Sequence, residues 1–114
     1  MPRDTSELLR GTLDLLVLKA LATQPLHGFG LSQWIEDRTR NELEIVDSAL
    51  YKSLHRLEDD GCIASEWGVS ENNRRAKFYS LTAAGRKQLA REAREWHQTA
   101  DLMAAFLAPK RGTP

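Results

Sequence analysis

The sequence predicts a mainly α-helical fold of the α+β class, in which helices surround one small β-hairpin. Near the start of the chain, apolar residues recur at helical spacing; they are Leu13, Leu16, Val17, Ala20 and Leu21. Two runs with strand-like alternation, 63–69 and 76–81, flank a polar turn at 70–75. Thr82 is a good capping residue, and a long helix is expected to follow it as far as about Leu107.

The composition is that of one small domain. The chain has 114 residues, a formal net charge of zero at pH 7 and a single cysteine, Cys62. One cysteine cannot form a disulfide within the chain, which favours a reducing compartment. The longest apolar run, 15–18, is too short to span a bilayer, and residues 1–10 lack the apolar core of a signal peptide. We therefore expect a soluble, cytoplasmic protein.

The first helix is apolar on more than one side. Three further apolar residues lie off its main stripe, namely Leu15, Leu18 and Ala22. Such a helix can pack on its own domain with one side and on a second subunit with another. Pro25 ends the segment, since proline disfavours helix at the residue before it. A second helix is expected to begin at Gly28, and a very short strand at 43–45 follows it.

A third helix is predicted between a cap at Asp47 or Ser48 and a stop at Gly61. Its buried stripe consists of Leu50, Leu54 and Leu57. At 100° per residue the other side of this helix is polar. The residues on that side and its flanks are Ser48, Tyr51, Lys52, His55 and Arg56.

The predicted order of elements is that of a winged helix-turn-helix. A helix is narrow enough to enter the major groove of DNA, where its outward side chains reach base edges. The hairpin beside it, the wing, can reach the flanking backbone, where phosphates favour arginine and lysine. The candidate DNA-binding residues are therefore the exposed side of the third helix and, in the wing, Asn72, Asn73, Arg74, Arg75 and Lys77.

Each of these features also has a simpler interpretation. The polar side of the third helix could be a solvated face, and an asparagine-rich turn is often only a turn. The three acids at 58–60 would repel phosphate, so only the first half of the helix is expected to enter the groove.

The last helix carries a heptad seam of its own. Its members are Leu89, Ala93, Trp96, Ala100, Met103 and Leu107. This seam could pack on the first helix of the same chain, but a second subunit is the preferred partner. Together with Leu13 and Leu16 it forms the predicted dimer interface. The expected organisation is a DNA-binding domain at 1–81, a dimerisation helix at 82–108 and a flexible tail at 109–114.

Four blocks of the sequence resemble the PadR-type transcriptional regulators, in the compact subgroup with a single C-terminal helix. The blocks are LLRGTLDLLVLKAL, PLHGFGLSQWIE, SALYKSLHRLEDDGCI and SEWGVSENNRRAKFYSLTAAGRKQL, and they run from about Leu8 to Leu107. The resemblance implies a homodimeric winged-helix repressor that binds a palindromic operator. Its recognition helix would begin with a segment like Ser48–Tyr51, and its C-terminal helix would cross to the partner.

Two positions depart from the family pattern. Lys52 replaces a common proline, which adds a cation to the proposed DNA-binding face. Phe29 stands where a tyrosine is frequent, so a hydroxyl group is missing there.

A small hydrophobic or aromatic effector is a further possible partner, because relatives include sensors of phenolic acids or planar drugs. Its candidate contacts are Trp96, Met103 and Phe106, which could line a gap at the dimer seam. The alternative is that these residues simply form the interface core.

Enzymatic functions find little support in the sequence. His27, His55 and His97 are isolated and have no metal-ligand spacing to Cys62 or a carboxylate. We find no nucleophile elbow, phosphate loop or dinucleotide motif, and we expect no metal or cofactor. His27 is expected to make a structural hydrogen bond and Cys62 to be a small buried hydrophobe. The other function class is a protein-interaction module that uses the same fold without DNA.

Overall fold

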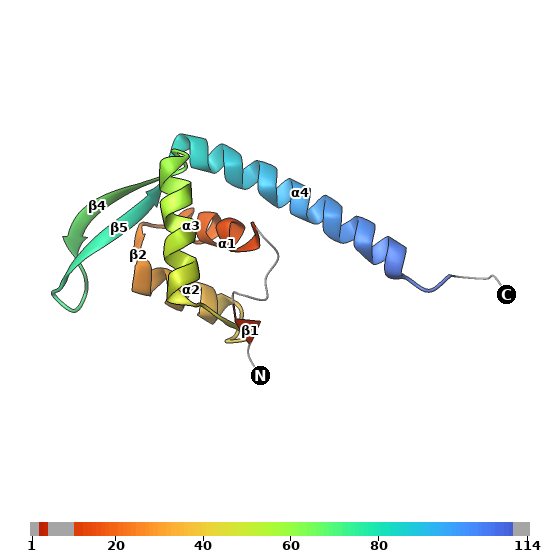
Figure 1. Ribbon diagram of the computed structural model, residues 1–114, viewed down its shortest axis with the longest axis horizontal. Helices are drawn as coiled ribbons and strands as arrows, with labels where there is room; N and C mark the ends of the chain where they lie inside the picture. Colours follow the sequence, from red (N-terminus) through yellow and green to blue (C-terminus); the bar gives the residue numbers. More distant parts are fainter. Residues whose placement is uncertain (1–2, 5–10, 111–114) are drawn as a thin grey trace.

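The computed structural model describes residues 3–4 and 11–110. In these residues the helices are α1 (Thr12–Leu21), α2 (Gly28–Arg38), α3 (Asp47–Asp59) and α4 (Ala83–Leu107). The strands are β1 (Arg3–Asp4), β2 (Leu26–His27), β3 (Leu43–Glu44), β4 (Ile63–Val69) and β5 (Arg75–Leu81). This is the predicted winged helix-turn-helix with a long C-terminal helix (Figure 1). The predicted tail at 109–114 lies mostly outside the described residues.

The wing is a regular antiparallel hairpin of β4 and β5, with Trp67 opposite Lys77 and Val69 opposite Arg75. A third strand, β2, pairs with the other edge of β5, so the sheet order is β2-β5-β4. The sequence does not predict β2, because two residues are too few to show strand alternation. This strand brings the start of α2 alongside the wing.

The core lies where α1, α2 and α3 meet under the sheet. Its largest fully buried apolar side chains are Leu18, Leu31, Ile35, Leu50, Leu54 and Val17. Val17, Leu50 and Leu54 belong to the predicted stripes, whereas Leu18 is buried although it lies off the main stripe of the first helix. Leu13, Leu16 and Leu89 are partly buried against this cluster. Cys62 is buried as expected, and burial raises the pKa of its thiol.

Two of the expected polar contacts at helix starts are present and one is not. His27 accepts a hydrogen bond on Nδ1 from the Gly30 amide (3.0 Å), and the Thr82 hydroxyl accepts one from the Gly85 amide (3.0 Å). The predicted cap of α3 by Asp47 or Ser48 is wrong, because Val46 occupies the N-cap position and Asp47 is already helical. Asp47 instead lies in the first turn, where its negative charge interacts favourably with the positive end of the helix dipole.

Helix α4 protrudes from the domain, and in Figure 1 it and the wing extend in opposite directions. The molecule is accordingly elongated, with principal extents of 65 × 33 × 21 Å. No helix within residues 11–110 is long and apolar enough to cross a membrane. The fold thus holds α3 and the wing on one side and leaves most residues of α4 exposed.

Candidate nucleic-acid interface

The predicted outer side of α3 is open to solvent. Leu50, Leu54 and Leu57 face the core, and this orients the polar side outward. The exposed residues of α3 include all the predicted ones, Ser48, Tyr51, Lys52, His55 and Arg56. The helix therefore presents hydroxyl, imidazole and cationic groups along one edge, which are side chains that can bond to bases or phosphates.

Aromatic rings and cations alternate on one face of the wing. The Arg75 guanidinium lies over the Trp67 ring, 4.7 Å from its centroid, and the Lys77 ammonium lies 5.9 Å from that of Tyr79. Trp67 is 58% exposed although it is large and apolar. The ring holds the guanidinium by a cation–π contact, and so limits the conformations of Arg75 before any ligand arrives.

The turn of the wing is closed by the backbone. The Ser70 amide donates to the Arg74 carbonyl oxygen (2.8 Å), and the Asn73 amide donates to that of Ser70 (2.9 Å). Asn73 has a φ of 57°, a left-handed conformation that asparagine tolerates better than most residues. Asn73 thus has a structural role in the turn, and Arg74 follows it in an exposed position.

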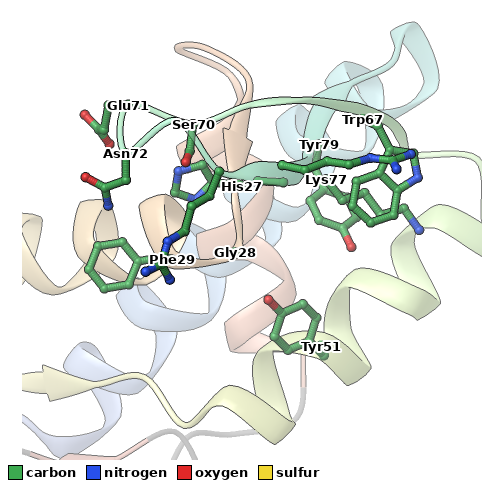
Figure 2. Close-up of a pocket in the computed structure, with 13 residues that line it drawn as sticks. His27, Gly28, Phe29, Tyr51, Trp67, Ser70, Glu71, Asn72, Lys77 and Tyr79 are labelled. Carbon is green, nitrogen blue, oxygen red and sulfur yellow. The ribbon is translucent and has the colours of Figure 1, made fainter.

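A cleft of about 610 Å³ separates the wing from the start of α2 and from α3. Figure 2 shows Tyr51 on one side of this cleft and the wing residues Trp67 and Lys77 on the other. Five predicted residues line it, namely Tyr51, Asn72, Arg74, Arg75 and Lys77. Three cations therefore face this cleft, against one acid, Glu71. The other predicted residues of the wing and of α3, including Asn73, do not line it.

Eight lining residues were not predicted as part of the site, and they include the aromatic rings of His27, Phe29, Trp67 and Tyr79. His27 packs edge-on against Phe78, with ring centroids 5.2 Å apart, and stacks at 6.4 Å on Phe29. Phe29 is 67% exposed. The placement of His27 and Phe29 depends on the pairing of β2 with β5, which has no signal in the sequence, whereas Trp67 lies in β4 opposite Lys77.

Gly28 and Tyr51 make the closest approach between α2 and α3 in the cleft. A Cβ atom on residue 28 would clash with the hydroxyl oxygen of Tyr51. The absence of a side chain at Gly28 therefore gives the Tyr51 ring its place on the floor of the cleft, where 44% of the residue is exposed. The hydroxyl group lies beside the first turn of α2, whose backbone amides attract anions.

The charge of Arg56 has a partner inside the domain. Its Nη2 atom lies 2.6 Å from Oδ1 of Asp14 in α1, and its Nε atom donates to Oδ2 at 3.1 Å. The Ser53 hydroxyl, which is fully buried, donates to the same carboxylate at 2.5 Å. This hydrogen bonding to Asp14 raises the pKa of Arg56. Neither Asp14 nor Ser53 is predicted as part of the site from the sequence.

The predicted seam of α4 is divided between two environments. Leu89 packs on the chain's own core. Ala93 and Trp96 border a largely apolar groove of about 320 Å³ beside Leu15 and Leu16 of α1. Beyond Ala100 the apolar side chains of the helix are exposed, including Leu102, Met103, Phe106 and Leu107. The simpler interpretation, packing on the first helix, thus holds for the first half of the seam.

Comparison with known proteins agrees with this geometry. A transcriptional regulator of Mycobacterium tuberculosis is 33% identical over 94 residues, which cover 82% of this chain and 84% of that protein. The solved structure of a transcriptional regulator from Clostridium thermocellum has a TM-score of 0.79 and 29% identity, covering 87% of this chain and 96% of the other. A PadR family transcriptional regulator from Eggerthella lenta has a TM-score of 0.76 and 32% identity, covering 89% and 86%.

All three of these proteins are transcriptional regulators. Residues 17–91 match the family described as the Transcriptional regulator PadR-like family. The match includes α2, α3 and the whole wing, so it spans the parts that line the cleft. This chain therefore belongs to the PadR-like family of transcriptional regulators, as its sequence predicts.

Proposed function

We propose that this protein is a homodimeric repressor that binds a palindromic operator, with α3 in the major groove and the wing on the flanking backbone. The observation that carries the proposal is the convergence of Arg74, Arg75 and Lys77 on one cleft with Tyr51 of α3. Phosphate contacts from such cations give affinity and orientation, while the helix supplies base contacts.

The proposed contacts are divided between the two elements. On α3 they are Ser48, Tyr51, Lys52 and His55, which are exposed along one edge. On the wing they are Asn72, Asn73, Arg74, Arg75 and Lys77. Arg56 is left out of this set, because Asp14 already binds its guanidinium. Lys52 gives α3 a cation that can reach either a phosphate or a guanine edge.

The dimer is proposed from the exposed half of α4. Leu107 is 70% exposed and Phe106 80% exposed, and a second copy would cover such side chains and gain hydrophobic free energy. The remaining seam residues, with Leu13 and Leu16 of α1, would complete the interface. Residues 1–81 would then form the DNA-binding domain and 82–108 the dimerisation helix. Two copies of α3 about one DNA turn apart would read the two halves of a palindrome.

The groove between α1 and α4 is the proposed site of a hydrophobic or aromatic effector that releases the DNA. Trp96 borders the groove, and apolar lining with one aromatic ring suits a planar apolar molecule. Met103 and Phe106 would reach such a ligand only from the partner's copy of α4, because they lie outside the groove of their own chain. An interaction module without DNA is the second candidate, and the exposed end of α4 is the observation that favours it.

The proposal is tested by the double variant Arg74→Ala/Arg75→Ala. Its matched control is Lys87→Ala/Arg94→Ala, which removes the same charge from two exposed positions on the side of α4 away from the seam. Binding would be measured by fluorescence anisotropy to DNA flanking the protein's own gene, after footprinting with the unaltered protein.

We expect the wing variant to lose at least about tenfold in affinity and the control to bind normally. The slope of log affinity against log salt concentration should fall by about two in the wing variant, since two phosphate contacts are lost. Equal affinity of the two double variants would refute the wing contacts. Failure of the unaltered protein to prefer any site in this DNA would favour the interaction module.

A further inference from the structure

The carboxylate of Asp14 connects α1, which borders the α1–α4 groove, to α3, the helix proposed to enter DNA. Asp14 of α1 is only 15% exposed and binds two residues of α3, Ser53 and Arg56. These two residues are one helical turn apart, so they lie on the same side of α3. A single acidic group therefore fixes α3 at two points along its axis.

The contacts are of a kind that restrains both rotation and sliding of α3. The guanidinium of Arg56 offers both Nε and Nη2 to the carboxylate, at 3.1 Å and 2.6 Å, and this bidentate geometry is strongly directional. The hydroxyl of Ser53 is fully buried, and its hydrogen bond is to Asp14. Turning α3 would leave a buried hydroxyl without an acceptor, which is costly.

The residues restrained in this way are next to residues proposed to touch DNA. Lys52 precedes Ser53, and His55 precedes Arg56. Neither Lys52 nor His55 has a restraining contact of its own among the hydrogen bonds and ring contacts described for residues 11–110. Their direction therefore follows from the orientation of the helix backbone.

We propose that Asp14 and Arg56 are positioning residues for DNA binding, which set the orientation of α3 and do not themselves contact the operator. This inference rests on the proposed DNA-binding function. Asp14 engages the Nε and Nη2 groups of Arg56, so a phosphate could use the guanidinium fork only by separating it from Asp14, which would leave a mostly buried carboxylate without its cation. Arg56 acts indirectly. Its contact with the Asp14 carboxylate of α1 orients α3, and the orientation of α3 sets the direction of Lys52 and His55.

The inference is tested with Asp14→Ala, Arg56→Ala and the double variant, on the footprinted operator and on a scrambled duplex of the same composition. We expect each single variant to lose at least about tenfold in operator affinity and the double variant to lose no more than Asp14→Ala, because Asp14→Ala already removes the contact that Arg56→Ala removes. Affinity for the scrambled duplex and the salt slope should not change. Asp101→Ala, an exposed acid on α4, is the charge-matched control for Asp14→Ala.

Two results would overturn the inference. If Arg56 touches phosphate, Arg56→Ala weakens binding to both duplexes and lowers the salt slope by about one. If Asp14 merely masks a DNA contact, Asp14→Ala tightens binding, because it removes a negative charge beside the DNA. The proposed restraint predicts the opposite sign for the operator.

Arg56→Lys separates the two roles without removing the charge. Lysine supports a phosphate contact but cannot reproduce the bidentate contact with a carboxylate. We therefore expect Arg56→Lys to bind the operator as weakly as Arg56→Ala, and normal binding by it would contradict the inference. Asp14→Asn, which keeps an acceptor for the Ser53 hydroxyl, should recover part of the loss.

Folding is followed by circular dichroism and thermal unfolding. If Asp14→Ala does not fold, Arg56→Lys and Arg56→Gln decide the question, because both alter a half-exposed side chain. The unaltered protein distinguishes the two levels of proposal. If it does not prefer the operator, the proposed function fails; if it does and the Arg56 variants bind normally, only the positioning role fails.

Discussion

The hydroxyl of Thr82 donates a hydrogen bond to the carbonyl oxygen of Gly61, 2.7 Å away. The hydroxyl oxygen of Thr82 in turn accepts a hydrogen bond from the Gly85 amide and so caps α4. One threonine thereby joins the end of α3, the end of the wing and the start of α4. The direction of the proposed dimerisation helix relative to the proposed recognition helix depends on this junction.

Replacement of Thr82 by alanine should lower the free energy of unfolding by about 1 to 2 kcal/mol, because the helix loses its cap and Gly61 loses a donor. Thr82→Ser keeps the hydroxyl and should lose much less. Both would be measured by urea unfolding. Thr99→Ala, in an exposed position within α4, is the control and should be neutral or slightly stabilising. Equal stability of Thr82→Ala and the unaltered protein would mean that the cap contributes nothing.

Gly85 makes a second contact at this junction, and a methyl group there should destabilise the protein. A Cβ atom on residue 85 would overlap the carbonyl oxygen of Cys62 and lie 2.8 Å from Cδ1 of Leu81. The backbone carbonyl cannot move away easily, so we expect Gly85→Ala to cost about 2 kcal/mol or more.

The control for Gly85 is Gly30→Ala in α2, where the added atom would meet its neighbours at 3.4–3.5 Å. That spacing is ordinary van der Waals contact, so alanine should be tolerated and can gain up to about 1 kcal/mol from helix propensity. In urea unfolding, we expect Gly85→Ala to lower the free energy of unfolding and Gly30→Ala to leave it unchanged or raise it. A neutral or stabilising Gly85→Ala would show that the start of α4 does not approach the Cys62 carbonyl so closely.

The free energy of unfolding should decrease at alkaline pH, because the folded protein buries two weakly acidic groups, the Cys62 thiol and the Tyr79 phenol. Burial raises the pKa of Cys62, and nearby Asp60 adds to the effect; burial likewise raises the pKa of Tyr79. The unfolded chain loses these protons at a lower pH than the folded one. The stabilising difference is therefore complete below the ordinary thiol pKa and is lost as pH rises through the folded value.

Urea unfolding at about pH 8 and about pH 10 would measure this loss. Cys62→Ala removes the thiol, so its free energy of unfolding should fall less between the two pH values than that of the unaltered protein. Tyr79 remains in both proteins, which makes the comparison specific for the thiol. Parallel decreases would show that the Cys62 thiol is not shielded in the folded state.

The parts of this fold that follow from sequence are those that depend on neighbours along the chain. The stripe of Leu50, Leu54 and Leu57 gives both the position of α3 and its buried side, as the structure confirms. Thr82 is predicted as a cap from its residue type, and it occupies the N-cap position of α4. Such patterns are local, because helical periodicity and capping act within a few residues.

The parts that do not follow from sequence depend on contacts between distant residues. Asp14 and Arg56 are 42 positions apart, so the helical wheel of α3 alone placed Arg56 on an open face. Trp67 joins the cleft because it lies opposite Lys77 in the hairpin, and an isolated tryptophan in a short strand gives no such sign. Val46 at the start of α3 has no capping side chain, which residue preferences would not predict.

The seam of α4 provides the test of the proposed dimer. Trp96 is 45% exposed at the point where α4 leaves α1, and an aspartate there would place a charge in the proposed interface, which is costly. We expect Trp96→Asp to sediment as a monomer at micromolar concentration. Its operator affinity should also fall, because two linked half-site contacts are replaced by one.

The matched control is Arg94→Asp, on the side of α4 away from the seam. This substitution introduces the same aspartate two residues away and changes the net charge by two units, one more than Trp96→Asp, so it is a stringent control for added negative charge on α4. It should remain dimeric, and circular dichroism should find both variants helical. A dimeric Trp96→Asp protein would place the interface elsewhere, because an aspartate cannot be buried there without loss of association. Monomers from both variants would instead indicate a general effect of added charge on α4.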